Sequence, residues 1–148
     1  MGLTPPIRAL IVEDFVPFQH FICSTLKKRP NVQVICVVSD GQDAVQKAED
    51  LKPDLIFLDI GLPTLNGIDA ARKIRKLSPK SKIIFVTQES SADVVQEAFN
   101  SGAEGYVLKT RAGIDLLDAV DTVLGGSRFV SKGLQDPPAP PTQPRCGS

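Results

Sequence analysis

The feature that most constrains the fold is a fivefold alternation of short apolar runs with segments of helical periodicity. Residues 55–58 read Leu-Ile-Phe-Leu, an unbroken run of the kind found in strands covered on both faces. Such runs predict strands over residues 7–12, 32–38, 55–59, 82–87 and 105–108. Apolar residues three and four positions apart predict helices over residues 15–28, 42–51, 68–77, 91–101 and 112–124.

Five strand–helix units of this length predict an α/β fold, a doubly wound five-stranded parallel sheet with helices on both faces. In such sheets, ligands bind at the carboxyl ends of the strands, near the point where the strand order reverses. We therefore look for functional side chains at the strand ends.

The chain is long enough for one domain, at 148 residues. We expect residues 1–133 to form that domain. Residues 134–148 contain five prolines and few apolar residues, a composition typical of a disordered tail or a truncated linker.

Composition excludes few functions. Lys plus Arg and Asp plus Glu number 17 each, so the chain is neutral. A nucleic-acid-binding domain favours a basic face, and we therefore expect no nucleic acid to bind this chain. No stretch approaches the ~20 apolar residues of a membrane span, and no signal peptide is visible. Cys23, Cys36 and Cys146 form no paired motif. We expect a cytoplasmic protein without a membrane partner.

Polar side chains stand at four of the predicted strand ends. Glu13 and Asp14 follow the first strand, Asp59 ends the third, Thr87 ends the fourth and Lys109 follows the fifth. Because parallel strands end at one edge of the sheet, these groups should lie close together. Carboxylates, an amine and a hydroxyl are the groups needed to hold a metal ion and a phosphoryl group.

Each of these residues also has a plainer interpretation. Asp59 could cap the loop that follows it, and Asp14 could be a helix N-cap, which is compatible with metal binding. Lys109 could be a solvated lysine and Thr87 an ordinary strand residue. Their joint occurrence, and no single residue, favours a functional site.

Several motifs resemble the receiver domain of bacterial two-component response regulators. They are the stretch Ala9-Leu10-Ile11-Val12-Glu13-Asp14, the stretch from Pro53 through Asp59 to Pro63, the pair Thr87 and Lys109 at their strand ends, and the run Gly102-Ala103-Glu104-Gly105-Tyr106-Val107-Leu108-Lys109. That last run is most similar to receivers of the subfamily with a helix-turn-helix output domain. The resemblance covers roughly residues 6–130.

The resemblance implies a flavodoxin-like or chemotaxis-regulator-like sheet of strand order 2-1-3-4-5. It also implies a signalling role and not an enzymatic one. A sensor histidine kinase would be the phosphoryl donor, and a phosphorylation-dependent homodimer is allowed. Self-catalysed phosphotransfer and slow autodephosphorylation would accompany this role.

By the same resemblance, Asp59 is the phosphoacceptor. Mg²⁺ is the implied cofactor, held by Glu13, Asp14, Asp59 and the backbone carbonyl of Gly61. Of the first two carboxylates, Asp14 is the more usual direct ligand.

The resemblance assigns Lys109 and Thr87 to the phosphoryl oxygens and makes Tyr106 a switch residue that moves with Thr87. Two departures from the family pattern stand near the site. Thr110 stands where family members often have proline, and this change does not threaten activity. Gln88 stands where a small residue is usual, and its longer side chain affects the expected phosphorylation rate but not the chemistry.

Two other functions compete with this interpretation. A haloacid-dehalogenase-like hydrolase also uses a strand-end aspartate with Mg²⁺, but needs an aspartate where this chain has Gly61. A degenerate receiver would act only as an interaction module, which the presence of the full set of site groups disfavours. Nucleotide binding is disfavoured because neither glycine-rich phosphate motif is present.

Overall fold

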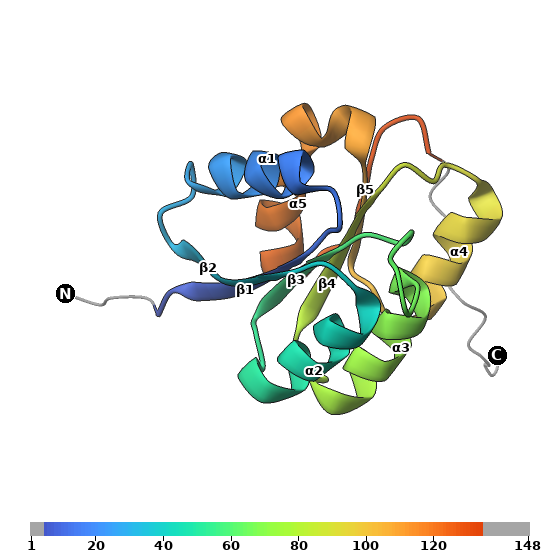
Figure 1. Cartoon of the computed structure of the whole chain (residues 1–148). Coiled ribbons are helices and arrows are strands. Elements are labelled where there is room, and N and C mark those ends of the chain that lie inside the picture. Colours follow the sequence, from blue (N-terminus) through green and yellow to red (C-terminus); the bar gives the residue numbers. More distant parts are fainter. Residues whose placement is uncertain (1–4, 135–148) are drawn as a thin grey trace, which may run out of the picture.

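The computed structural model describes residues 5–134, in which helices cover both faces of a six-stranded parallel sheet (Figure 1). The strand order is β2-β1-β3-β4-β5-β6. The strands are β1 (Ile7–Val12), β2 (Val32–Val38), β3 (Leu55–Leu58), β4 (Lys82–Thr87), β5 (Gly105–Leu108) and β6 (Phe129–Val130). The helices are α1 (Val16–Leu26), α2 (Gly41–Leu51), α3 (Gly67–Leu77), α4 (Ala92–Asn100) and α5 (Ala112–Leu124).

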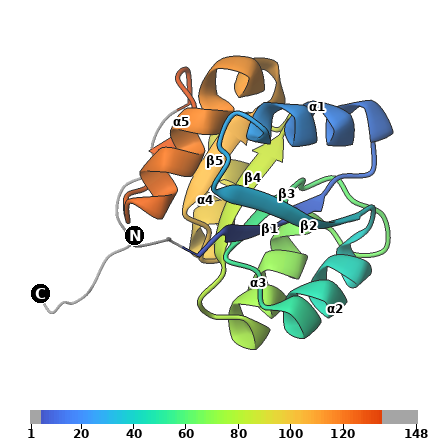
Figure 2. The same cartoon turned by 90° about the vertical axis from the view of Figure 1, so that its left-hand side faces the viewer.

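Two hydrophobic layers flank the sheet. Helices α1 and α5 cover one face, and α2, α3 and α4 cover the other (Figures 1 and 2). Phe57 and Leu116 belong to the first layer, and Leu58 and Ile74 to the second; all four are fully buried. Because successive residues of β3 face opposite sides, its unbroken apolar run supplies both layers.

The expected doubly wound parallel sheet is confirmed, but the expected strand count is wrong. Strand β6 adds a sixth strand beside β5, with Gly105 paired with Phe129 and Tyr106 with Val130. Its two residues are too few to show periodicity, and a glycine-rich turn precedes them. Two backbone amides fix the pairing, Phe129 N donating to Glu104 O and Ser131 N to Tyr106 O.

Most predicted element bounds lie within one residue of the observed ones. Strand β3 ends at Leu58, so Asp59 is the first residue beyond the strand. Helix α1 is shorter at both ends than the expected 15–28 because Pro17 stands in its first turn and the chain turns after Leu26.

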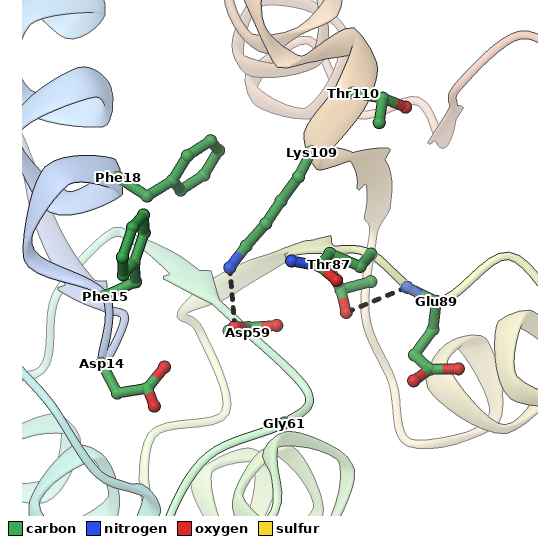
Figure 3. Close-up of a pocket in the computed structure, with 10 residues that line it drawn as sticks. Asp14, Phe15, Phe18, Asp59, Gly61, Thr87, Glu89, Lys109 and Thr110 are labelled. Carbon is green, nitrogen blue, oxygen red and sulfur yellow. Dashed lines mark hydrogen bonds and ion pairs between the residues drawn. The ribbon is translucent and has the colours of Figure 1, made fainter.

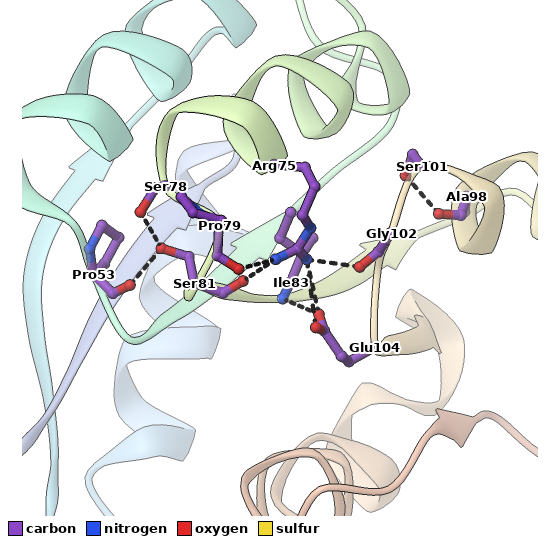
Figure 4. Close-up of polar contacts among 10 residues, drawn as sticks. All are labelled: Pro53, Arg75, Ser78, Pro79, Ser81, Ile83, Ala98, Ser101, Gly102 and Glu104. Atoms are coloured by element: carbon purple, nitrogen blue, oxygen red, sulfur yellow. Dashed lines mark hydrogen bonds and ion pairs between the residues drawn. The ribbon is translucent and has the colours of Figure 1, made fainter.

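A network of hydrogen bonds connects the segments at the amino end of the sheet, opposite the end at which Asp59 lies (Figure 4). The Arg75 guanidinium at the end of α3 donates to the carbonyls of Pro79, Ser81 and Gly102 at 2.9, 2.7 and 2.6 Å. It also pairs with Glu104 at 3.1 Å, and that carboxylate accepts from Ile83 N. One side chain thus ties α3 to the loops that enter β4 and β5.

Of the expected tail, only Leu134 lies in the described part of the chain. It packs against the layer that contains Tyr106, and its amide donates to Ser131 O. Residues 135–148, including Cys146, lie outside the described residues.

Candidate functional site

The site forms where the chain leaves β1, β3, β4 and β5. Asp59 N still donates to Val12 O at 3.1 Å, so the first residue after β3 stays in register with β1. Behind it the loop folds back tightly: a Cβ atom on Gly67 would lie 1.9 Å from the Asp59 carbonyl oxygen. Only glycine fits there, and this close approach fixes the Asp59 backbone.

Lys109 bridges two carboxylates at these strand ends, and Figure 3 shows its contact with one of them, Asp59. Its Nζ donates to Asp59 Oδ2 at 2.9 Å and lies 2.8 Å from Glu13 Oε1. The three side chains are largely buried, with exposed fractions of 13% for Lys109, 9% for Asp59 and 1% for Glu13. The ion pairs therefore lie where water screens them weakly.

Glu13 is the most constrained group of the site. Its Oε2 accepts from Phe15 N at 3.0 Å, whereas its buried Oε1 accepts no hydrogen bond and has the Lys109 ammonium at 2.8 Å as its ion-pair partner. Burial raises the pKa of Glu13, and the charge of Asp59 adds to the rise; Lys109 and the Phe15 amide offset only part of it.

The pKa of Lys109 is raised as well, but by its charged neighbours and not by burial. Burial opposes its charge, yet the carboxylates of Glu13 and Asp59 outweigh that effect and raise the pKa of the ammonium. Lys109 therefore stays charged across the physiological range.

Asp14 completes an acidic cluster. Carboxylate oxygens of Glu13, Asp14 and Asp59 all lie within 4.8 Å of one another. Asp14 is exposed, and its side chain does not cap α1, whose N-cap is Phe15 without a side-chain hydrogen bond. Within residues 5–134, Lys109 is the only cation paired with this cluster. Hard oxygen donors with excess negative charge, among them a buried carboxylate oxygen that accepts no hydrogen bond, fit a divalent cation such as Mg²⁺.

Thr87 and Tyr106 meet at the backbone of Glu89. Thr87 Oγ1 accepts from Glu89 N at 3.4 Å, and the Tyr106 hydroxyl donates to Glu89 O at 2.8 Å. Tyr106 is fully buried, with its ring centroid 6.3 Å from that of Phe99 on α4. Burial first, and then the charges of Glu89 and Asp59, raise the pKa of the Tyr106 phenol.

An open cavity of about 780 Å³ lies over Asp59, Thr87 and Lys109. Gly61 and the exposed Gln88 line it, as does Asp14. The structure thus brings Asp14, Asp59, Gly61, Thr87 and Lys109 to one cavity. Glu13 joins them through Lys109, and Tyr106 lies behind Thr87.

Three residues of this cavity were not anticipated from the sequence: Phe15, Phe18 and Glu89. The helical period assigned Phe18 to the core, whereas its ring also faces the Lys109 ammonium, 4.9 Å from the ring centroid. The backbone role of Glu89 depends on the loop conformation, which the sequence does not display. Phe15 is 61% exposed, and its position next to Glu13-Asp14 was the one available signal.

Among the described residues, no helix is both long and apolar enough to cross a lipid bilayer.

Comparison with known proteins matches residues 9–121 to the response regulator receiver domain. The response regulator protein VraR of Staphylococcus saprophyticus is 32% identical over 115 residues, which are 78% of this chain and 55% of that protein. A LuxR-family two-component response regulator from Aurantimonas sp. SI85-9A1 has a similar structure, with a TM-score of 0.81 and 28% identity over 86% of this chain and 91% of that one.

A third relative bears on nucleic acid. A LuxR-family DNA-binding response regulator from Staphylococcus aureus is similar at a TM-score of 0.74 and 25% identity, over 79% of this chain and 98% of that one. The chain spans about half the length of the curated relatives it matches. These findings contradict the expectation that nucleic acid is not a partner. That expectation was wrong because a neutral net charge averages over all of a chain's surface and so does not exclude a nucleic-acid partner.

The family match covers most of the chain, and the relatives are themselves named response regulators. With an acidic cluster, a lysine and a threonine at the carboxyl edge of the sheet, this chain belongs to the response regulator receiver domain family.

Proposed function

We propose that Asp59 accepts a phosphoryl group from the phosphohistidine of a sensor kinase. A carboxylate oxygen of Asp59 attacks phosphorus, so that an O–P bond forms as the P–N bond breaks. The electron pair of that bond stays on the histidine nitrogen of the kinase, and the product is an acyl phosphate. The observation that supports this role is the Asp59 carboxylate at the floor of an open cavity, held by Lys109 at 2.9 Å.

Mg²⁺ is the proposed cofactor, with Glu13, Asp14, Asp59 and the Gly61 carbonyl as its protein ligands. When bound, it would neutralise the charge that builds up on the phosphoryl oxygens. Glu13 Oε1 supports this assignment, because this buried oxygen accepts no hydrogen bond and shares its ion-pair partner Lys109 with Asp59, so a cation would offset the remaining negative charge.

Lys109 and Thr87 are proposed to bind the phosphoryl oxygens. Lys109 is a compact positive charge already next to Asp59, and it can leave one carboxylate for the incoming oxygens. Thr87 Oγ1 has only a weak contact of 3.4 Å, so its hydroxyl hydrogen is free to turn to a phosphoryl oxygen.

Tyr106 is proposed as the switch residue. Movement of Thr87 toward a phosphoryl group would change its contact with Glu89 in the β4–α4 loop, and Tyr106 bonds to the same residue. Phosphorylation would then alter the surface made by α4, β5 and α5, the basis of a two-state signal. The LuxR-family relatives make DNA a candidate output target of the whole regulator.

A direct test is incubation with acetyl phosphate, a small phosphoryl donor, followed by intact mass measurement. Uptake of one phosphoryl group in Mg²⁺, absent in excess EDTA, is the expected result. A protein that takes up none in either condition would be a degenerate receiver.

The hydrolase alternative is tested with a chromogenic phosphate ester. Gly61 supplies no carboxyl group that could act as general acid, so turnover should not exceed the buffer rate. Sustained Mg²⁺-dependent turnover that Asp59→Asn abolishes would instead favour an enzyme.

A further inference from the structure

Lys109 has a third neighbour besides its two carboxylates, the ring of Phe18. The ammonium nitrogen lies 4.9 Å from the ring centroid, within the range in which an aromatic face attracts a cation. The Lys109 side chain is only 13% exposed, so water weakens this attraction little. Figure 3 shows the amine between the Phe18 ring and the Asp59 carboxylate.

The local structure holds the Phe18 ring in this place. Phe18 lies in the first turn of α1, and its amide donates to Phe15 O at 3.0 Å. Gln19 Nε2 donates to Glu13 O at 2.5 Å, which ties that turn to the end of β1. The ring stacks on Phe21, with centroids 5.3 Å apart. Phe18 is therefore anchored to the same strand end as Glu13.

The two carboxylates next to Lys109 do not keep their charge or partners during the proposed reaction. Asp59 becomes an acyl phosphate, and Glu13 is needed by the metal site. The face of an aromatic ring, in contrast, attracts the ammonium equally before and after phosphoryl transfer, because its charge distribution does not change.

The geometry points to Phe18 as a positioning residue that holds the Lys109 ammonium beside Asp59 while the anionic partners of that ammonium change. Phe18 does not touch the reacting atoms, so it acts through Lys109. This inference rests on the proposed function, to which it adds a residue that determines the phosphorylation rate.

The competing interpretation is that Phe18 only packs between α1 and the sheet, since it also borders the hydrophobic layer under α1 and α5. Two substitutions separate the roles. Phe18→Leu keeps an apolar side chain but removes the ring face, whereas Phe18→Tyr keeps the face. Phe129→Leu is the matched control, because it removes a ring that borders the same hydrophobic layer from β6 and does not support Phe18.

The first measurement is the rate of phosphorylation by acetyl phosphate in saturating Mg²⁺. We expect Phe18→Leu to lower the maximal rate roughly two- to fivefold with little change in the half-saturating donor concentration. Phe18→Tyr and Phe129→Leu should stay within about twofold of the wild-type rate, as expected if the ring face over Lys109 is what matters. A Phe18→Leu protein that reacts at the wild-type rate, or a Phe18→Tyr protein as slow as Phe18→Leu, overturns the inference.

The second measurement needs no phosphorylation. A ring face shifts the NMR signals of protons above it upfield, so the ε-methylene protons of Lys109 should lie upfield in the wild type and in Phe18→Tyr compared with Phe18→Leu. Equal shifts in all three proteins overturn the positioning role. If the wild type took up no phosphoryl group, the proposed function would fail, whereas the NMR comparison would still decide whether Phe18 holds Lys109.

Discussion

The hydroxyl of Tyr106 donates a 2.8 Å hydrogen bond to the backbone carbonyl of Glu89, whose amide in turn lies 3.4 Å from Thr87 Oγ1. One loop residue therefore contacts both the last residue of β4 and the aromatic residue of β5. The fully buried Tyr106 ring also packs near Phe99 of α4, so a movement of this loop reaches α4 and β5 together.

In the folded protein, the Tyr106 phenol should keep its proton at pH values well above the ordinary pKa of tyrosine. Its pKa is raised by burial, so the folded chain holds the phenolic proton more tightly than the unfolded chain does. This stabilisation is fully present below about pH 10, the ordinary pKa of tyrosine, and is lost as the pH rises through the raised pKa.

This titration can be followed without interference, because the chain has one tyrosine and no tryptophan. Phenolate absorbance should appear only at a pH above about 10, together with unfolding. Tyr106→Phe should show no phenolate signal and should lower the free energy of unfolding by roughly 1 kcal/mol at neutral pH. A phenol that ionises reversibly near its ordinary pKa in the folded protein would contradict the buried, hydrogen-bonded position.

Asp14→Asn should weaken Mg²⁺ binding without weakening the metal-free fold. The exposed Asp14 carboxylate makes no hydrogen bond within residues 5–134 that the substitution would break, and it adds negative charge to an acidic cluster. We expect Mg²⁺ affinity to fall about tenfold or more, where each factor of ten is about 1.4 kcal/mol. Calorimetric titration measures the affinity, and thermal unfolding in EDTA provides the control. Unchanged affinity would remove Asp14 from the metal site.

Arg75→Ala should destabilise the fold while sparing the site chemistry. The substitution leaves three carbonyls and the Glu104 carboxylate without their charged donor, and we expect a loss of about 2–4 kcal/mol in unfolding free energy. Phosphoryl uptake should persist under conditions in which the variant is folded, because the Arg75 network lies at the amino end of the sheet, away from Asp59. Urea denaturation measures the loss.

The matched control for Arg75 is one turn earlier on α3. Arg72 pairs at the surface with Asp69 and Glu97, and its side chain is 46% exposed. Because exposed ion pairs contribute little, Arg72→Ala should leave the denaturation midpoint almost unchanged. Equal losses in the two variants would mean that the Arg75 network has no special structural role.

Ser131→Ala should weaken the attachment of β6. The buried Ser131 Oγ accepts from Leu108 N at 3.0 Å, and its loss leaves a strand amide without an acceptor. We expect a cost of about 1–3 kcal/mol and faster amide exchange in residues 129–131. Ser127→Ala, at an exposed position of the preceding turn, is the comparison variant. If both variants exchange and unfold like the wild type, β6 is not held through Ser131.

Much of this molecule could be predicted from its sequence because its main signals are local. The run Leu55–Leu58 is apolar at every position, which predicts a doubly covered strand and places Asp59 at the rim. The starts of α2, α3 and α4 were predicted from apolar spacing alone, and in the structure Asp40, Asn66 and Ser91 cap them by accepting from the amide three residues on.

The rest depends on contacts between distant segments. Strand β6 exists because β5 offers an open edge, and two residues carry no periodic signal of that pairing. The bond from Tyr106 to Glu89 O needs a particular loop conformation, and the ring of Phe18 meets Lys109 only after α1 has packed against α5 and β1. Burial of these groups is a property of the assembled fold.

The most direct test of the central claim locates the phosphoryl group itself. After reaction with acetyl phosphate and Mg²⁺, borohydride reduction converts an aspartyl phosphate to homoserine, which peptide mass spectrometry can place in the chain. We expect homoserine at residue 59 alone, dependent on Mg²⁺ and absent without donor. Homoserine at another aspartate with residue 59 unchanged, or equal phosphoryl uptake by Asp59→Asn, would contradict it.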